Sequence, residues 1–246
     1  MLINGSVASF AQNTDQPQPA TRFSGTITVT NKGISTIPSF TLGKPAVVFD
    51  LSIGRGKFSF EPQFRFALEG KPWSFLFWGR YKLLTGNKFL INMGAHPALS
   101  FKTKNYMVNG VSTETMVVKR YLAGDLTPTF IVSKNISIGA YYLYSYGVEN
   151  DIIKHTHFIA ARANFSNIKL SDQYSMRFNP QIYYLKTDRQ DGFYWGSTLS
   201  VSKKNCPVSI SSLVNKTIKS NVLGSKDFIW NVSIIYSFNK RYIAVK

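Results

Sequence analysis

The chain has 246 residues, and its 29 Lys and Arg against 12 Asp and Glu give a net charge of +17. This length allows one or two soluble domains or a single barrel of about a dozen strands. No stretch approaches the roughly 18 apolar residues that a membrane-spanning helix needs, and the single Cys206 excludes an internal disulfide framework and a multi-cysteine metal site.

The first residues resemble the end of a secretory signal peptide. Ser9 and Ala11 are small residues at the positions that precede a possible signal-peptidase cut before Gln12. We therefore interpret residues 1–11 as the remnant of a signal peptide. Residues 12–22 are polar and contain prolines, so we expect them to form a disordered N-terminal lead-in.

Alternation of apolar and polar residues begins directly afterwards and predicts β-strands. The first strand is expected over residues 23–32, and the second over residues 39–53. Phe40 and Leu42 are out of phase with the later part of the second strand, which predicts a bulge or bend near residues 43–45.

The alternation is clearest in the third expected strand, residues 58–68. Its apolar positions are Phe58, Phe60, Pro62, Phe64, Phe66 and Leu68, and its intervening positions are Ser59, Glu61, Gln63, Arg65 and Ala67. Neighbouring side chains of a strand point to opposite faces, so one face is a continuous apolar band and the other is polar. A bulky apolar outside and a polar inside are typical of a transmembrane β-barrel.

The same alternation predicts nine further strands. They cover residues 72–84, 88–102, 115–132, 136–149, 152–168, 173–187, 192–203, 206–218 and 227–238. Pro62 and Pro97 lie inside expected strands and argue against central positions there, because proline cannot donate to a β-ladder. The longest links, 103–114 and 219–226, both fall at the end opposite the tight turns, as expected for extracellular loops and periplasmic turns.

These observations predict an all-β protein, a single antiparallel transmembrane β-barrel of about 12 strands over residues 23–238, integral to a bacterial outer membrane. Residues 239–246 are expected to form a short basic tail. The basic residues lie largely in turns and at isolated polar positions, a distribution that suits outer-membrane lipid and lipopolysaccharide and not nucleic acid. Cys206 is expected to be a buried or lipid-facing small hydrophobe.

Residues 31–83, NKGISTIPSFTLGKPAVVFDLSIGRGKFSFEPQFRFALEGKPWSFLFWGRYKL, resemble a family of uncharacterised outer-membrane β-barrel proteins from Bacteroidetes. The last strand, FIWNVSIIYSF (228–238), resembles the C-terminal signal that outer-membrane barrels present to the assembly machinery, although NKRYIAVK follows its final aromatic residue. The resemblance implies a fold and a location, and it brings no catalytic or binding residues.

The polar face of the strands supplies the candidate site. Its members are the expected lumen and solute-path residues Glu61, Arg65, Arg80, Lys82, His96, Tyr121, Asp125, Arg162, Arg177 and Tyr183, accompanied by Gln63, Asn179 and Gln181. Basic groups outnumber acidic ones, which favours anions by simple electrostatics. We therefore expect a narrow passive channel that prefers small anionic solutes.

Three alternatives stay open at this point. Glu and Arg inside a small barrel can pair across the lumen, which would make the protein a sealed structural or partner-binding barrel. A lipid-modifying barrel enzyme would need a His beside a Ser nucleophile, and the sequence shows no such arrangement near the membrane rim. A soluble all-β protein would have to bury the apolar face of residues 58–68.

The three histidines do not change this expectation. His96 lies on the polar face as a lumen residue, whereas His155 and His157 share an outward face near the extracellular end of their strand. Two His at this spacing could bind a metal, and Glu149 or Asp151 could add a ligand, but interfacial residues are the favoured interpretation. No enzymatic activity, cofactor or metal is therefore expected.

Overall fold

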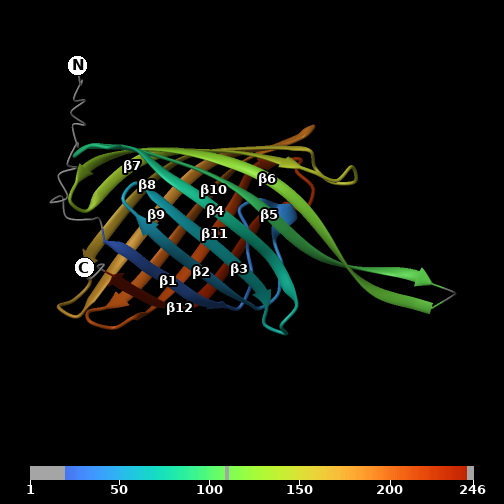
Figure 1. The fold of residues 1–246 in the computed structure, drawn as a ribbon, viewed down its shortest axis with the longest axis horizontal. Helices are drawn as coiled ribbons and strands as arrows, with labels where there is room; N and C mark the ends of the chain where they lie inside the picture. The colour runs from blue at the N-terminus through green and yellow to red at the C-terminus, as the bar shows by residue number, and fades with distance from the viewer. Residues whose placement is uncertain (1–19, 109–110, 243–246) are drawn as a thin grey trace, which may run out of the picture.

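The computed structural model describes residues 20–108 and 111–242, and these form a closed antiparallel barrel (Figure 1). The strands are β1 (Thr21–Thr30), β2 (Ala46–Arg55), β3 (Phe58–Ala67), β4 (Pro72–Thr85), β5 (Phe89–Val108), β6 (Val111–Ser133), β7 (Ile136–Gly147), β8 (His155–Lys169), β9 (Tyr174–Thr187), β10 (Gln190–Lys203), β11 (Val208–Ser220) and β12 (Phe228–Tyr242). The predicted count of 12 strands is confirmed. The predicted signal remnant, residues 12–19 of the lead-in and residues 243–246 lie outside the described residues.

Each strand pairs with its neighbours in sequence, and β1 pairs with β12 to close the barrel. The closing ladder runs from Thr21 opposite Tyr242 to Thr30 opposite Ser233, so β12 continues beyond Phe238, where the last strand was expected to end. The first and last strands enter and leave at the same end of the barrel (Figure 1). This end also carries the tight turns between β2 and β3 and between β6 and β7, and it is the periplasmic end.

The outer surface of the barrel is apolar all round. Leu122, Ile182 and Ile234 expose 56%, 55% and 57% of their surface, and aromatic rings such as Phe64 and Phe75 pack beside one another on the same face. Water would penalise so much exposed apolar area, whereas the hydrocarbon core of a bilayer does not. The barrel is therefore an integral membrane protein of the outer-membrane type. In the described part of the chain, no helix is long and apolar enough to cross a membrane.

Four prolines lie inside strands, each beside an interruption of one ladder. Pro62 is paired with a residue of β4, but the ladder between β3 and β2 is interrupted at Pro62. Pro97 is paired with a residue of β6, but the ladder between β5 and β4 is interrupted at Pro97. Pro128 and Pro180 likewise pair regularly on one side only. A missing N–H is tolerated at such places because no ladder bond is lost there.

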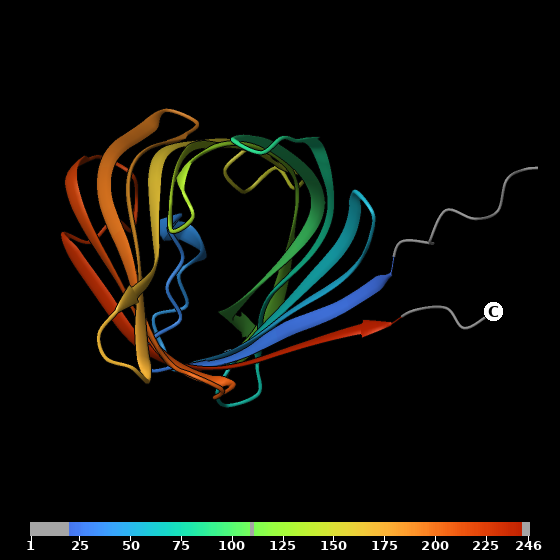
Figure 2. The ribbon, with the colours of Figure 1, turned by 90° about the vertical axis from the view of Figure 1, so that its left-hand side faces the viewer.

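The link between the first two strands differs most from expectation. Residues 39–45 were predicted to begin the second strand, but β2 begins at Ala46, and the preceding segment, residues 31–45, enters the barrel (Figure 2). We call it the inserted segment. It contains a single turn of 3-10 helix, Pro38–Phe40. The out-of-phase residues Phe40 and Leu42 mark this departure from the strand.

The expected outer loop 103–114 is also different, because β5 and β6 continue as a long hairpin. This hairpin projects from the end of the barrel opposite the chain termini (Figure 1). Two smaller expectations were wrong. Cys206 is exposed in the turn between β10 and β11, and Trp73, placed outward by simple alternation, is only 5% exposed. A register shift between β3 and β4 beside Trp73 turns its ring inward.

Candidate functional site in the lumen

The alternation of the strands places all ten predicted site residues on the lumenal face. Glu61 and Arg65 come from β3, Arg80 and Lys82 from β4, and His96 from β5. The remaining five are Tyr121 and Asp125 on β6, Arg162 on β8, and Arg177 and Tyr183 on β9. Several of them lie around Arg80, and Tyr183 belongs to an aromatic cluster that the sequence did not predict.

Arg80 is the centre of the first group. Its Nη1 donates to Asp125 Oδ2 at 2.6 Å, and its Nε donates to Glu61 Oε2 at 3.1 Å. Its guanidinium also lies over the Trp78 ring, 4.0 Å from the ring centroid. The Asp125 side chain is completely buried, and its second oxygen, Oδ1, makes no hydrogen bond of ordinary geometry within the described structure. Arg80 is therefore the ion-pair partner of Asp125 in the described part of the chain, and Tyr141 and Arg162 also lie close to this carboxylate.

This arrangement requires a glycine on the neighbouring strand. A Cβ at Gly94 would lie 3.0 Å from both Arg80 Nη1 and Asp125 Oδ1, and 3.1 Å from the Trp78 ring. Any larger residue would force the Arg80 and Asp125 side chains to shift. The His96 ring also lies against Trp78, with 3.8 Å between the centroids and the ring planes tilted by 41°.

A second arginine lies nearer the outer mouth. Arg65 donates to Gln63, which in turn donates to the carboxylate of Asp50, and the Arg65 guanidinium lies 5.1 Å from the centroid of the Trp73 ring. Asp50 and Trp73 were not predicted as lumenal. Asp50 could have been found, because it shares the phase of Ser52 on β2, whereas Trp73 could not, because the bulge that turns it inward leaves no sequence signal.

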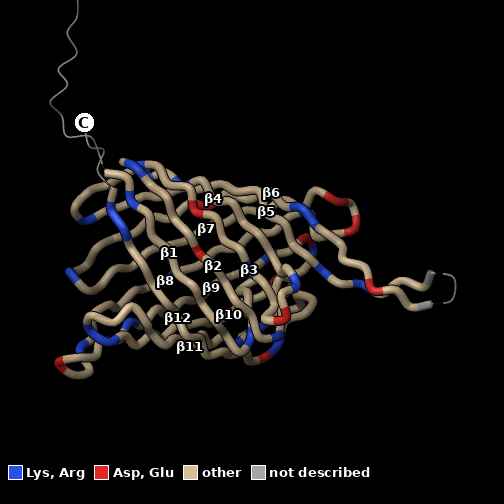
Figure 3. The backbone as a smooth tube through the Cα atoms, turned by 60° about the horizontal axis from the view of Figure 1, so that its bottom comes forward, with Lys and Arg blue, Asp and Glu red and all other residues tan. Residues whose placement is uncertain are grey.

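Arg162 and Arg177 come from β8 and β9, and Arg162 lies within electrostatic range of Asp125 and Arg80. Arg162 lies 4.9 Å from the centroid of the Tyr141 ring, and in the described ranges neither arginine has a carboxylate within ion-pair distance. The lumenal side chains of the barrel wall include five predicted basic ones, Arg65, Arg80, Lys82, Arg162 and Arg177, and the acidic Asp50, Glu61 and Asp125. Arg22 and Arg241, opposite each other on β1 and β12, share the lumenal phase at the periplasmic end. Further Lys and Arg lie at both ends of the barrel (Figure 3).

The outer half of the lumen is packed along β7–β10. Phe158, Tyr183, Leu185 and Tyr194 are at most 4% exposed, and the rings of Tyr183 and Tyr194 stack at 4.8 Å. Ile37 of the inserted segment packs against this cluster. The cluster closes one side of the lumen and confines any path to the other side.

Three contacts hold the inserted segment in place. Tyr183 Oη donates to Thr36 O at 3.3 Å, and Trp73 Nε1 donates to Phe40 O at 2.8 Å. The Phe40 ring makes an edge-on contact with the Tyr121 ring at 4.8 Å. Because these partners come from β9, β4 and β6, the segment spans the lumen and contacts both walls.

The space left between the inserted segment and the β3–β7 wall is a cavity of about 300 Å³. Its polar and aromatic lining includes Arg65, Trp78, Arg80, His96, Tyr121 and Tyr141. A larger apolar groove, about 600 Å³, lies on the lipid side over Ala140, Ala161 and Ala163 and faces the bilayer, not the lumen.

The outward histidines contact tyrosines. Tyr144 Oη and His155 Nδ1 are 2.8 Å apart, and Tyr142 Oη and His157 Nδ1 are 3.0 Å apart. Among the described residues, no three His, Cys, Asp or Glu side chains are grouped to hold a metal. His96 Nδ1 faces Pro97 O at 3.2 Å, and none of the histidine contacts in the described structure is to a serine or threonine hydroxyl.

The architecture is shared with solved outer-membrane proteins. The structure of the KdgM porin in complex with disordered oligogalacturonate is similar, with a TM-score of 0.52, 11% sequence identity, and coverage of 88% of this chain and 99% of that chain. The barrel is an outer-membrane β-barrel. The COG4313 outer membrane channel from Pseudomonas putida F1 is also similar, with a TM-score of 0.51, 10% identity, and coverage of 93% and 100%. No family model and no curated protein matches the sequence. The resemblance to a Bacteroidetes family stays a prediction.

Proposed function

We propose that this protein is a narrow passive channel that prefers small anionic solutes, with small acidic sugars as the best-suited class. The observation that carries the proposal is that most lumenal basic groups have no ion-pair partner among the described residues and that three of them lie over aromatic rings. Of the five predicted ones, only Arg80 has an ion-pair partner among the described residues, and Arg65, Arg80 and Arg162 each lie over an aromatic ring. A ring holds a guanidinium in place and leaves its N–H edge free to donate to an anion.

The remaining features agree with a sugar-like solute. The cavity beside the inserted segment combines aromatic faces with arginine donors, which suits a flat ring that bears a carboxylate. The KdgM porin, whose fold is similar, was obtained with oligogalacturonate, an acidic sugar chain. The excess of basic over acidic side chains on the lumenal wall adds a preference for anions.

Single-channel recording tests the proposal. The refolded protein in a planar bilayer with a KCl gradient is expected to conduct in steps, with a reversal potential that indicates anion preference. Arg65→Gln and Arg162→Gln should each shift this potential toward zero, whereas Lys88→Gln, in a periplasmic turn, should leave it almost unchanged. Cation preference, or silence from protein whose folding and insertion are verified by heat-modifiable migration, would overturn the channel.

A sealed structural or partner-binding barrel is the second candidate, because the inserted segment and the packed cluster occupy the outer half of the lumen. In that case the cavity would have no through-path. Deleting residues 34–42 from the inserted segment separates the two functions. A channel that already conducts should conduct more after the deletion, whereas a sealed barrel should begin to conduct only then.

A further inference from the structure

The β5–β6 hairpin leaves the barrel sheet near Ser100 and Tyr121. Beyond Ser100, β5 has no partner on β4, and before Tyr121, β6 has no partner on β7, so that in this part of the hairpin the two strands pair with each other and not with the rest of the barrel sheet. It stands above the end of the barrel that lies opposite the chain termini (Figure 1). Side chains that continue the lumenal phase of the two strands therefore lie over the outer mouth.

Three of these side chains are lysines. Lys102 and Lys104 continue the phase of the lumenal Ser100, and Lys119 continues the phase of Tyr121. Lys102 and Lys104 are exposed, whereas Lys119 is almost buried. Partial burial and the nearby charges of Lys104 and Lys119 lower the pKa of Lys102, as expected when three ammonium groups share one face.

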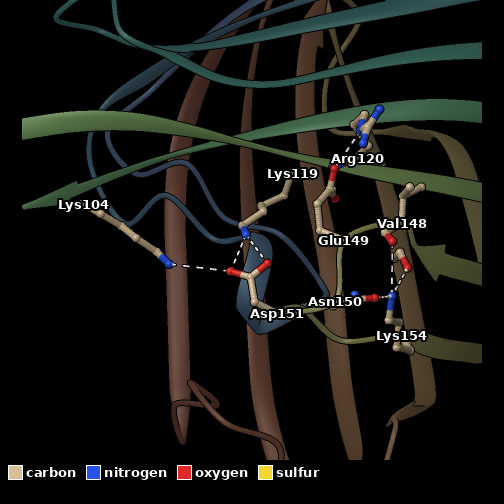
Figure 4. Close-up of polar contacts among 9 residues, drawn as sticks. Lys104, Lys119, Arg120, Val148, Glu149, Asn150, Asp151 and Lys154 are labelled. Atoms are coloured by element: carbon tan, nitrogen blue, oxygen red, sulfur yellow. Dashed lines mark hydrogen bonds and ion pairs between the residues drawn. The ribbon is translucent and has the colours of Figure 1, made fainter. Parts of the chain in front are cut away.

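One carboxylate lies between Lys104 and Lys119 (Figure 4). Lys119 Nζ donates to both carboxylate oxygens of Asp151, which belongs to the link between β7 and β8, and Lys104 Nζ lies 4.0 Å from Asp151 Oδ2. The Lys119 side chain is only 10% exposed, whereas that of Asp151 is 58% exposed. Three positive charges against one negative charge leave a local excess of +2 over the mouth.

Lys119 and Lys104 are the basic residues that hold the Asp151 carboxylate in the described structure. The same link is anchored independently on the outer face of β6, where Arg120 Nε donates to Glu149 Oε1 at 2.7 Å and the Arg120 backbone N–H donates to Glu149 Oε2 at 2.8 Å. Asp151 can therefore release Lys119 without releasing the link. Its position shows that the lysines can hold a carboxylate between them.

We infer that Lys104 and Lys119, with Lys102 beside them, form a second anion site, which binds a carboxylate of an acidic oligosaccharide at the outer mouth in place of Asp151. Tyr106 shares the face of Lys102 and Lys104 and is 45% exposed, so its ring is available to stack on a sugar. The ligand class, acidic sugars, is taken from the proposed function, and the hairpin site is where such a ligand would bind first.

Equilibrium binding of trigalacturonate to the full-length protein in detergent micelles at low salt tests this site without any measurement of current. Lys102→Gln/Lys104→Gln should weaken binding about tenfold, the combined effect of two exposed charge contacts. The matched variant Lys203→Gln/Lys204→Gln removes two lysines at the periplasmic end and should change binding less than about twofold. Asp151→Asn removes the competing carboxylate and should tighten binding about threefold. The affinity for neutral maltotriose should be the same in all variants and in the wild type.

Two results would overturn the site. Equal weakening by the hairpin and the periplasmic pairs would show that trigalacturonate responds only to the overall charge of the protein. Unchanged affinity in the hairpin pair, with circular dichroism showing an intact fold, would show that the lysines do not contact it. After either result, the proposed channel function still stands if the protein conducts with anion preference. Conversely, a barrel that does not conduct but binds trigalacturonate through the hairpin lysines would contradict the channel function and support the second anion site.

Discussion

The dependence of Asp125 on Arg80 can be measured as a change in stability. Arg80→Ala leaves the Asp125 carboxylate, whose side chain is fully buried, without its ion-pair partner. Removing one member of a buried ion pair costs about 3–5 kcal/mol, and because the Arg80 side chain is 28% exposed we expect the lower end, about 3 kcal/mol. The half-exposed contact with Glu61 adds less than about 1 kcal/mol.

Asp125→Asn in the Arg80→Ala background removes the stranded charge, so it should restore about 2 kcal/mol of the lost free energy of unfolding. Urea unfolding in lipid vesicles, followed by far-UV circular dichroism, measures the four members of this double-mutant cycle. Arg177→Ala serves as the control, because it removes a lumenal arginine without an ion-pair partner among the described residues. A double variant as unstable as Arg80→Ala, or a loss in Arg80→Ala no larger than in the control, would refute the argument.

Three further predictions concern the inserted segment, the lipid face and the outer link. Phe40→Ala removes the edge-on ring contact of the inserted segment and should raise both single-channel conductance and current noise; a conductance equal to that of the wild type would contradict this. Leu126→Arg places a charge on the lipid face and should cost about 2–4 kcal/mol of unfolding free energy in vesicles, whereas Thr129→Arg, which faces the lumen, should cost much less. The hydrogen bond from Arg120 lowers the pKa of Glu149, so its contribution is present at neutral pH and is lost as the pH falls below about 4; hydrogen exchange in residues 148–154 should accelerate only there. If hydrogen exchange in residues 148–154 accelerated already at pH 6, a group other than Glu149 would anchor this link.

Periodicity alone predicted the strands and the lumenal phase, because a barrel in a bilayer imposes one rule on every strand. Phe58 to Leu68 and the wall arginines follow that rule without exception. The inserted segment could not be predicted, because its contacts with Trp73, Tyr121 and Tyr183 join distant strands and have no local period.

The packed cluster was missed for a related reason. The alternation places Phe158 and Tyr194 on the lumenal face. It does not predict whether an aromatic side chain on that face contacts water or packs against another ring. The hairpin was expected to be a loop because Lys102 to Asn105 show no apolar alternation. Outside the bilayer, however, two strands can pair through their backbones without such alternation.

The unequal filling of the interior gives the two sides of the barrel different mechanical support. Around Tyr183 and Tyr194, the wall is held between lipid outside and a dry aromatic layer inside, in the manner of a central sheet in a sandwich. The wall that carries Arg80 has a water-accessible cavity behind it and relies on the bilayer and a few ion pairs for its shape. Extraction from lipid into detergent should therefore soften β2–β5 first, and the barrel should lose its round cross-section before it loses its strands.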